Sequence, residues 1–457
     1  MMHAPKEIVV LGHGVFDLLH LGHIRHLKEA RSLGDKLVVS ITADHHVNKG
    51  PGRPQFSAEQ RREALLALEC VDEVIISQSG TAIESIQALK PAYYVKGPDY
   101  ADGQFHLGLA EEIAAIEGVG GKFHTTTAEK WSSTALLRHV RLPPASLAYL
   151  EQARQRGFLD RIRTAFAEAD KLTIAFIGET IIDEYIYVKP LGRPLKEPIP
   201  CTVYEKAESF QGGVMAASQH AEWKHARHLT SLDELDVITK TRFVDDVTFR
   251  KLYENYSCRD VRFSPHGRKV MRQRIRSLVK WADVCIVYDF GHGLMEEEEI
   301  DLFGWTGKSK PTFIAATAQA NAANFGYNLI SKYYTYANMV CVDEPEARLS
   351  AGLRTEPLRP VLDEMAGFAT HAVITRGRNG SSIPGTDIPA FVDGGLDSMG
   401  AGDAFLAVAA PLVATGLPLE MAAFAGNVAG GLKTSIIGHR THVTRDDIIK
   451  NIEWLLG

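Results

Sequence analysis

The chain alternates short apolar runs with longer amphipathic stretches. Residues 7–12, EIVVLG, form an apolar run that predicts a buried strand, and residues 22–33 carry apolar side chains at helical spacing. The same order recurs further along, with predicted strands at 36–44, 71–77 and 92–97 and a helix at 57–69 that Ser57 would cap. This alternation predicts a parallel sheet covered by helices, with ligands bound at the carboxyl ends of its strands.

A break in this pattern divides the chain. Residues 141–170 open with two consecutive prolines and continue as a charged amphipathic stretch, which predicts a helical linker. A new strand is predicted to start in KLTIAFIGETIIDEYIYV, and strand–helix alternation continues through ADVCIVYDFGHG, MVCVDEPEARL and HAVITRGRNGSS. We therefore expect two α/β domains, residues 1–140 and 171–457, which are not duplicates of each other.

Composition narrows the class of partner. The 457 residues are 45% hydrophobic, and 50 basic against 56 acidic residues give a net charge of -6. This charge gives no reason to expect nucleic acid or a membrane as partner, so small molecules are expected instead. The five scattered cysteines fit neither a zinc site nor a disulfide framework, and no secretion signal or spanning segment is visible. We expect reduced thiols in a cytoplasmic protein.

Histidines cluster where the first predicted strand gives way to a helix. His20 and His23, in HLGH, would add imidazole donors to the backbone N–H groups of a helix start, which already favour phosphate. Fixed donors of this kind stabilise the charge that grows on phosphate oxygens during nucleotidyl transfer. Gly22 would let the backbone approach closely. The same pair could instead be a helix cap or surface decoration.

Four ordered motifs in the first half carry a resemblance to a known family. The stretches are GVFDLLHLGH, FSAEQRREALLALECVDEV, YYVKGPDY and SSTALL. Together they resemble the cytidylyltransferase-like nucleotidyltransferases over residues 7–140. The resemblance implies a Rossmann-like domain in which His20 and His23 stabilise the transition state. Residues implied to bind the nucleotide, its phosphates or the substrate are Gly14, Phe16, Asp17, Gly22, Lys49, Arg61, Lys96, Asp99, Ser133 and Thr134.

Some polar residues of this half fall outside the motifs. His13 stands where relatives often carry a small polar residue, so the choice between ATP and CTP stays open. His26, His45 and His46 are expected to be solvated, and Arg62 is expected to be an exposed helix charge.

The second half contains a glycine-rich turn followed by an acid, DSMGAGDAFLAVAA, at residues 397–410. Gly400, Ala401 and Gly402 would present successive backbone amides to a transferring phosphoryl group, and Asp403 could accept the proton of an attacking hydroxyl. The alternative is a plain tight connection between two elements.

The turn and two further motifs, ITRGRNGS and DEPE, resemble the ribokinase-like (pfkB) carbohydrate kinases. The resemblance makes Asp403 the catalytic base and Gly400 to Gly402 the anion hole, and it implies that Glu346 influences magnesium through water. Residues implied to line the nucleotide site are Thr375, Gly377, Gly380 and Asn427. Residues implied to hold sugar hydroxyls are Asp183, Gly212 and Gly213.

Two departures from the kinase pattern affect the acceptor. Val214, Met215 and Ala216 follow the glycine pair where the family normally has an asparagine, and the short stretch behind them suggests a shortened sugar-binding part. The stretch AATAQANAANFGYN, residues 315–328, replaces a loop that usually carries a basic residue.

A kinase joined to such a transferase resembles the bifunctional enzymes that make ADP-heptose, with the domain order reversed. We therefore expect a bifunctional sugar kinase and sugar-1-phosphate nucleotidyltransferase, using Mg²⁺ and ATP or CTP and assembling as a homodimer. Heptose is the first candidate substrate. One competing hypothesis is a monofunctional nucleotidyltransferase, perhaps for a CDP-polyol, whose kinase-like half serves dimerisation or ligand binding. The other is a nucleotide sensor without activity.

Overall fold

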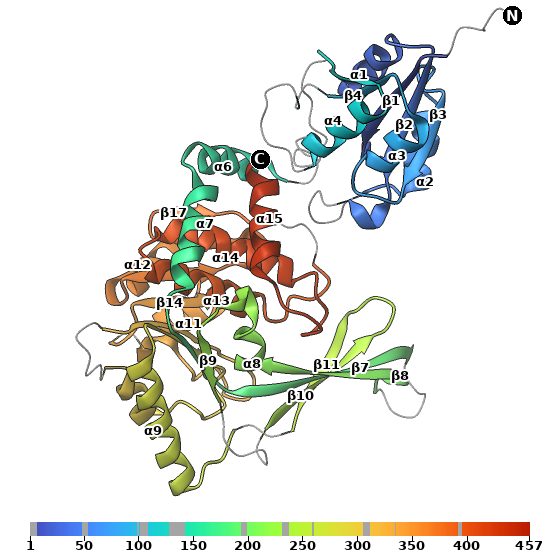
Figure 1. Ribbon diagram of the computed structural model, residues 1–457. Coiled ribbons are helices and arrows are strands. Elements are labelled where there is room, and N and C mark those ends of the chain that lie inside the picture. The colour runs from blue at the N-terminus through green and yellow to red at the C-terminus, as the bar shows by residue number, and fades with distance from the viewer. Residues whose placement is uncertain are drawn as a thin grey trace, which may run out of the picture. The chain divides into compact units, whose positions relative to one another are not determined.

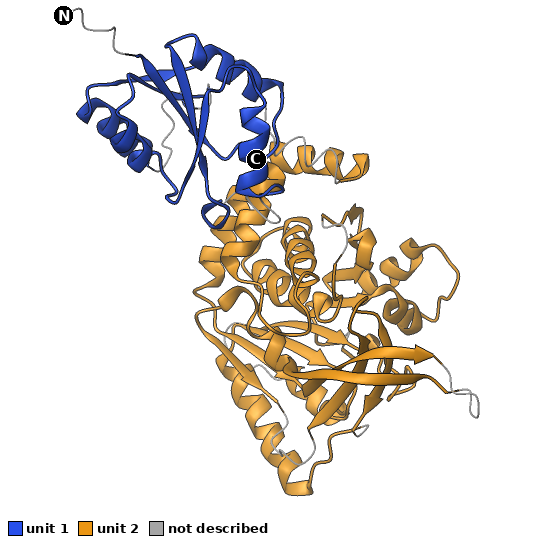
Figure 2. Cartoon of the chain, turned by 90° about the vertical axis from the view of Figure 1, so that its right-hand side faces the viewer, with its two compact units in different colours: residues 1–141 blue, residues 142–457 orange. Residues whose placement is uncertain are grey.

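The computed structural model describes residues 7–47, 54–97, 100, 108–127, 142–192, 199–230, 237–257, 260–304, 311–333, 335–391 and 395–457. These residues form two compact units, Met1–Arg141 and Leu142–Gly457 (Figures 1 and 2). The helices of the described residues include none that is both long and apolar enough to cross a membrane.

The first unit is built on a five-stranded parallel sheet in the order β3-β2-β1-β4-β5. Its strands are β1 (Val9–Gly14), β2 (Lys36–Thr42), β3 (Glu73–Ser77), β4 (Tyr93–Lys96) and β5 (Lys122–Thr125). Its helices are α1 (Leu21–Arg31), η1 (Asp44–His46), α2 (Ala58–Leu66), α3 (Ile83–Leu89) and α4 (Leu109–Gly118). Alternate strand residues pack into two separate apolar clusters, with Val10 in one and Leu11 in the other. Helices therefore cover both faces of the sheet, as the strand–helix alternation predicts.

The helix cap predicted at Ser57 is present in this unit. Ser57 caps α2, accepting from Gln60 N while the Gln60 side chain accepts from Ser57 N. This reciprocal pair satisfies two backbone donors that a helix start leaves open.

The prediction for His26 is wrong: the residue is 8% exposed, and its Nδ1 lies 2.8 Å from Thr126 Oγ1. It shares the inner face of α1 with Leu27 and Ala30, which are fully buried.

The second unit is built on an eight-stranded sheet in the order β17-β16-β15-β14-β13-β12-β6-β9. The strands are parallel from β15 to β9, whereas β16 and β17 are antiparallel. Their bounds are β6 (Ile174–Gly178), β9 (Ala226–Leu229), β12 (Val284–Asp289), β13 (Phe313–Ala318), β14 (Met339–Asp343), β15 (His371–Thr375), β16 (Ser381–Ile383) and β17 (Thr386–Ile388). The sheet matches the α/β class predicted for this half.

Helices cover both faces of this sheet. On one side lie α6 (Pro144–Gln155), α7 (Phe158–Ala169), α13 (Ala401–Ala414), α14 (Leu419–Lys433) and α15 (Arg445–Leu456). On the other side lie α9 (Pro265–Trp281), α10 (Glu297–Ile300), η5 (Asp301–Gly304), η6 (Ile330–Tyr333), α11 (Glu344–Ala351) and α12 (Leu358–Phe368). Successive strand residues such as Ile286 and Val287 are both buried, each in the core of a different face. The helices α6 and α7, from the stretch predicted as a linker, pack into the core of this unit.

A second, four-stranded sheet projects from the unit (Figure 1). Its order is β11-β10-β7-β8, with β7 (Thr180–Gly192), β8 (Cys201–Gly213), β10 (Ile238–Asp245) and β11 (Lys251–Tyr256). The single strand predicted to start near residue 171 is in fact two strands, because the chain leaves the large sheet after Gly178 and enters the small sheet at Thr180. The short elements α8 (Val214–Ala217) and η3 (His220–Glu222) follow β8, and η7 (Gly377–Asn379) follows β15.

Candidate active sites

The first site lies at the start of α1, directly after β1. His20 is the N-cap residue of α1, and its Nδ1 accepts a hydrogen bond from His23 N at 3.4 Å. The two imidazole rings stack with centroids 3.9 Å apart, and Phe16 lies against His23 at 5.2 Å. The capping role considered for this pair is therefore present. The same geometry holds two imidazoles together at a helix N-terminus, where an anion is stabilised.

Contacts with buried groups hold the turn between β1 and α1 in place. Asp17, 3% exposed, accepts from the backbone N–H groups of Gln55 and Phe56. Phe16 adopts a positive φ of 49°, and a Cβ on Gly14 would come within 3.0 Å of its ring. Gly22 is buried in the first turn of α1. These contacts fix the path of the turn.

Arg61 binds protein groups on every side. Its side chain is fully buried, and it donates to the carbonyls of Val15, Thr42 and Phe56 and to Asp44 Oδ1 at distances of 2.6–3.1 Å. The guanidinium therefore ties the loops that follow β1 and β2 to α2. A phosphate would meet Arg61 only if some of these contacts were exchanged.

Lys96 belongs to a buried polar cluster at the end of β4. Its Nζ lies 3.4 Å from Glu112 Oε2, and Tyr94 donates to the same carboxylate at 2.7 Å. Desolvation lowers the pKa of Lys96, although Glu112 opposes this change. His13 lies 3.1 Å from Ser40 Oγ, and desolvation together with the charge of Lys96 lowers its pKa to about 4. Sequence reasoning missed Glu112, which comes from α4 and carries no motif.

Four candidate residues of the first half, Lys49, Asp99, Ser133 and Thr134, lie outside the described residues.

The second site lies at the start of α13. Gly400 is the N-cap residue with φ 73°, and Ala401 and Gly402 form the first turn, followed by Asp403. Tyr288 donates to the backbone carbonyl of Asp403 at 3.0 Å. Desolvation raises the pKa of the Asp403 carboxyl to about 6, with Asp183 adding to the rise and His439 and Lys433 opposing it. A carboxyl with this pKa can accept a proton near neutral pH.

The small sheet brings Asp183 to the same region. Asp183 on β7 pairs with Arg242 on β10, and its Oδ2 lies 3.3 Å from His439 Nε2. Gly212, near the end of β8, is in such close contact that a Cβ there would lie 2.1 Å from Asp183 Oδ2. Gly213 has φ 60°, and a Cβ there would lie 2.3 Å from Glu179 O. Both glycines are required by close approach of other groups, and Asp183, Gly212 and Gly213 lie together.

Arg242, His439 and Lys433 were not predicted from the sequence. Hydrogen bonding from His439 and the charge of Arg242 lower the pKa of Asp183, against the desolvation that would raise it. Lys433, fully buried, donates to Met399 O at 2.8 Å and to Gly438 O at 2.7 Å, which fixes the segment before the glycine turn. These three side chains act on Asp183 and Asp403 from distant parts of the chain, where no local motif marks them.

The candidate nucleotide residues meet around β15 to β17. Gly377 and Gly380 both have positive φ, and a Cβ on Gly380 would lie 2.0 Å from Ile388 O. Asn427 on α14 donates to that same carbonyl at 3.1 Å and to Pro389 O at 3.2 Å. Thr375, the last residue of β15, donates to Val342 O at 3.4 Å.

Glu346 is held near the start of α11. It accepts from the backbone N–H groups of Asp343 and Ala320 at 3.1 and 3.2 Å. Desolvation raises its pKa to about 8, and the nearby Asp343 adds to the rise. Two carboxylates that disfavour each other's charge would be relieved by a divalent cation. Among the described residues, however, no group of three or more His, Cys, Asp or Glu side chains could hold a metal ion.

Comparison with known proteins finds a family match for one segment in each half of the chain. Residues 11–139 match the cytidylyltransferase-like family, and residues 315–444 match the pfkB family of carbohydrate kinases. The bifunctional protein HldE of Aliarcobacter butzleri (strain RM4018) is 38% identical over 133 residues, 28% of each chain. HldE of Sulfurimonas denitrificans (strain ATCC 33889 / DSM 1251) is 42% identical over 126 residues, which are 27% of this chain and 26% of that protein.

These alignments span little more than a quarter of the length of the relatives. Among solved structures, ribokinase from Thermotoga maritima aligns with a TM-score of 0.48 and 13% identity, covering 62% of this chain and 99% of that one. Along the sequence, the segment similar to the cytidylyltransferase-like family comes first and the segment similar to the pfkB carbohydrate kinases second.

Proposed function

We propose that the protein is a bifunctional sugar kinase and sugar-1-phosphate nucleotidyltransferase, with heptose as the first candidate sugar and ADP-heptose as the product type. The observation that carries this proposal is the pair of helix starts at α1 and α13, each within a segment that matches the corresponding family. One start presents His20 and His23, and the other presents Gly400 to Asp403. Because both reactions consume nucleoside triphosphates, we place the enzyme in the cytoplasm.

In the transferase reaction, an oxygen of the sugar 1-phosphate attacks the α-phosphorus of the NTP, and pyrophosphate leaves. His20 and His23 would donate hydrogen bonds to phosphate oxygens on which negative charge grows. The N-terminus of α1 adds its own positive partial charge. No covalent protein intermediate is required. Lys96 in its buried cluster would help to shape the site.

In the kinase reaction, the anomeric hydroxyl of the sugar attacks the γ-phosphorus of ATP, and ADP leaves. Asp403 would accept the hydroxyl proton, while the amides of Gly400 to Gly402 bind the transferring phosphoryl group. Asp183 and the Gly212–Gly213 pair would hold the sugar. Thr375, Gly377, Gly380 and Asn427 would line the nucleotide site. The raised pKa of Asp403 supports its assignment as the base.

Both reactions are expected to require a divalent cation, most simply Mg²⁺ bound to the triphosphate. Magnesium keeps several waters and needs only one or two carboxylates besides phosphate oxygens, and Glu346 would act through such a water. We expect excess chelator to abolish two activities. One is phosphorylation of the sugar by ATP, and the other is the release of pyrophosphate. Restoring Mg²⁺ should recover both. Full turnover in chelator would contradict this prediction.

The proposal is tested by incubating the purified chain with ATP or CTP and a panel of pentose, hexose and heptose phosphates. Mass spectrometry identifies any bisphosphate and any nucleotide-activated sugar. Phosphorylation of one sugar together with nucleotidyl transfer to a sugar 1-phosphate supports the bifunctional reading. Nucleotidyl transfer without phosphorylation of any sugar would favour the monofunctional alternative, and neither activity would favour the sensor.

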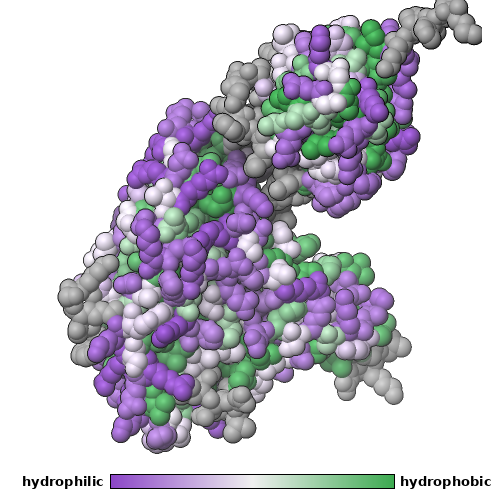
Figure 3. Space-filling model, viewed as in Figure 1, coloured by the Kyte–Doolittle hydropathy of each residue, from purple (hydrophilic) through white to green (hydrophobic). Residues whose placement is uncertain are grey.

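The projecting sheet supports the homodimer as a further part of the proposal. Large side chains exposed on its strands and turns are Leu191, Tyr204, Val247 and Tyr253, at 51–75% exposure. Figure 3 shows hydrophobic residues among hydrophilic ones on this face of the molecule. Exposed apolar side chains mark protein interfaces where they gather in one patch. Light scattering on the full-length chain would give the mass. A Tyr204→Glu variant should shift a dimer toward the monomer, and a monomeric wild-type protein would contradict the assembly.

A further inference from the structure

A buried lysine lies against the glycine turn at the start of α13. Lys433, the last residue of α14, is fully buried. Its Nζ donates to the backbone carbonyls of Gly438 at 2.7 Å, Met399 at 2.8 Å and Ile436 at 3.5 Å. Met399 directly precedes Gly400, and a Cβ on Gly400 would lie 3.4 Å from Lys433 Cε. The amino group therefore lies in a cage of three carbonyl oxygens, next to the turn.

The three carbonyls match the charged form of the side chain. An ammonium group has three N–H donors, whereas a neutral amine has only two. Desolvation lowers the pKa of Lys433, whereas the negative charges of Asp397, Asp403 and Asp183 raise it. A positive charge next to the first turn of α13 adds to the positive partial charge of that helix N-terminus, and both favour an anion there.

The carbonyl cage is also held together by groups other than the lysine. Asp397 Oδ1 accepts from Met399 N at 3.1 Å, and its Oδ2 accepts from Gly438 N at 2.9 Å. One carboxylate thus ties together the two residues whose carbonyls lie nearest to the ammonium. Thr434 O accepts from the N–H groups of Leu396 and Asp397, which joins the end of α14 to the same segment. The carbonyls are therefore preorganised around one point.

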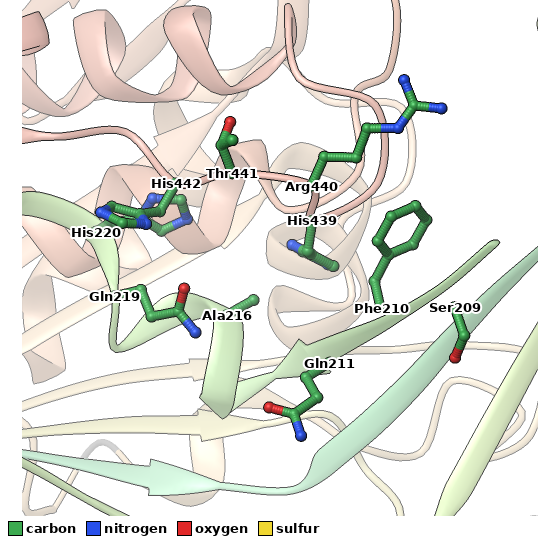
Figure 4. Close-up of a pocket in the computed structure, with 10 residues that line it drawn as sticks. All are labelled: Ser209, Phe210, Gln211, Ala216, Gln219, His220, His439, Arg440, Thr441 and His442. Atoms are coloured by element: carbon green, nitrogen blue, oxygen red, sulfur yellow. The ribbon is translucent and has the colours of Figure 1, made fainter.

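The cage does not open into the cavity beside it. A Cβ on Gly438 would lie 2.5 Å from the Phe210 ring, so this part of the loop packs against β8. Figure 4 shows the next two residues, His439 and Arg440, near Phe210 at a cavity of about 420 Å³. The described residues that line this cavity include these three side chains but not Lys433. An ion from solution would have to displace the ammonium to enter the cage.

Backbone carbonyl oxygens in such arrangements are ligands for K⁺. An ammonium group carries the same charge as K⁺, is similar in size and binds to the same oxygens. The carbonyls of Met399, Ile436 and Gly438 would therefore suit either cation. In this chain the cation is part of the protein.

We propose that the Lys433 ammonium occupies a monovalent-cation site, so that the chain needs no K⁺ from solution, and that it positions Gly400 to Gly402 for the transferring phosphoryl group. Lys433 is a positioning residue, because it acts through the turn. The positioning role rests on the proposed kinase function, whereas the occupied cation site does not depend on it.

The first test compares salts on the full-length wild-type protein. Sugar phosphorylation is measured in the chlorides of tetramethylammonium, Na⁺ and K⁺. At equal ionic strength, which keeps screening constant, kcat should change less than about twofold among them. The melting temperature should likewise be the same in tetramethylammonium and K⁺. A severalfold rise in kcat with K⁺, or a melting temperature that K⁺ raises, would overturn the inference.

The second test removes the ammonium and supplies it again. Lys433→Ala lacks the atoms from Cγ to Nζ, which together correspond to n-propylammonium, and leaves a cavity in their place. In tetramethylammonium, kcat for phosphorylation should fall about tenfold or more, with a smaller change in the KM for sugar. Added n-propylammonium should restore the rate. The uncharged 1-propanol should not, and tetramethylammonium is too bulky to enter.

Two further variants separate charge from packing and from general salt effects. Lys433→Met fills the space without a charge, so its kcat should stay low in every salt. Lys251→Ala is the matched control, because it loses the same atoms from a lysine 2.8 Å from Asp397 Oδ1 whose side chain is 34% exposed. Equal rescue of Lys251→Ala and Lys433→Ala by n-propylammonium would overturn the inference. Wild-type kcat in Lys433→Ala or in Lys433→Met would do the same.

Thermal melts separate the cation site from the proposed function, since they need no turnover. n-Propylammonium should raise the melting temperature of Lys433→Ala in a saturable way and leave that of wild type unchanged. This result in a protein that phosphorylates no sugar would leave the internal cation standing while the kinase proposal fails. No shift in folded Lys433→Ala would overturn the cation site even in an active kinase. If Lys433→Ala folds in neither condition, the wild-type melts and Lys433→Met decide the outcome.

Discussion

Asp403 lies among charges of both signs, and its surroundings set the pH range of the proposed kinase. Desolvation raises its pKa to about 6, and the carboxylate must be ionised to accept a proton. We expect kcat/KM for sugar phosphorylation to fall about tenfold per pH unit below about 6 and to level off above it. A pH–rate profile measures this acidic limb. A control without sugar, at saturating ATP, corrects the profile for buffer effects.

The positive charges near Asp403 offer a check on that assignment. His439 and Lys433 lower the pKa of Asp403 from the value that desolvation alone would set. Removing the imidazole, as in His439→Gln, should therefore move the acidic limb to higher pH. Asp403→Asn should abolish phosphorylation while ATP still binds, because the amide keeps the shape but cannot take the proton. A limb that stays in place in His439→Gln would assign it to another group.

Single residues also mark where the sequence was informative and where it was not. The Gly212–Gly213 pair and Gly400 were predicted from their resemblance to kinase motifs, and their binding roles stay predictions. The structure shows close approach of other groups at all three and a positive φ at Gly213 and Gly400. His439 and Arg242 could not be predicted, since they reach Asp183 only after the small sheet and the loop before α15 come together. His26 was misplaced because a polar side chain on the inner face of α1 finds a partner in Thr126, 100 residues away.

The N-terminus of α13 depends on the backbone conformation of Gly400. Its φ is 73°, and a Cβ there would lie 3.0 Å from His439 and 3.4 Å from Lys433. We expect Gly400→Ala to cost about 1–3 kcal/mol of stability from left-handed strain and to lower kcat for phosphorylation at least tenfold. Displacement of the first-turn amides would account for the loss in rate. Chemical denaturation and steady-state kinetics measure the two effects.

Gly416, just beyond the C-terminus of α13, provides the control. Its φ is 90°, yet a Cβ there would meet nothing within 4 Å. Gly416→Ala should therefore carry the backbone strain without the contact with His439 and Lys433, and its kcat should match wild type. An equal loss of kcat in both variants would show that α13 as a whole, not its first turn, controls the rate.

At the level of elements, the alternation of strands and helices was predictable because it is local. The capping box at Ser57 and the parallel strands of both units follow from patterns within a dozen residues. The division of residues 171–188 between two sheets was not predicted, since the apolar run continues through it. Glu179 marks the division: its buried carboxylate accepts from the N–H groups of Phe290 and His292. Only the folded β12–α10 connection supplies those donors.

On the scale of the whole molecule, the two units have separate apolar cores. His23→Ala should lower nucleotidyl transfer about 10²-fold or more, the usual cost of a preorganised donor, while phosphorylation stays unchanged. Asp403→Asn should have the reverse effect. Pyrophosphate release and sugar phosphorylation, measured on the same preparations, report the two sites. Loss of both activities in either folded variant would contradict independent sites.

Acidification should distinguish the two units by their stability. In the first unit, desolvation lowers the pKa values of His13 and His26 to about 4, from 6.5 in an unfolded chain. The unfolded state then binds more protons between these values, so the stabilisation from neutral burial is complete above pH 6.5 and is lost as pH falls toward 4. At pH 5 the loss is at most about 2 kcal/mol for each histidine.

In the second unit, burial raises the pKa values of some acidic groups, so these groups change stability with pH in the opposite direction. His220 behaves like His13, but burial raises the pKa of Glu179 to about 7 and that of Glu346 to about 8. Their contribution to stability is present below pH 4.5 and is lost as pH rises through these folded values, so acidification from pH 7 to 5 restores part of it. These gains exceed the loss at His220, and Asp403, whose pKa burial raises to about 6, adds to them. The second unit should therefore gain stability over the range in which the first loses it.

Hydrogen exchange on the full-length chain, corrected for intrinsic rates at each pH, can follow both units in one sample. Between pH 7 and 5, protection should fall in β1 and α1 and rise in β12 and β14. His26→Asn keeps an acceptor near Nδ1 for Thr126 but cannot titrate, so it should remove about half of the pH dependence in the first unit. Parallel losses in both units, or an unchanged slope in His26→Asn, would mean that other groups control the acid response. The carboxylates with lowered pKa values, Glu112 and Asp183 among them, lose their contribution only below about pH 4, beneath this window.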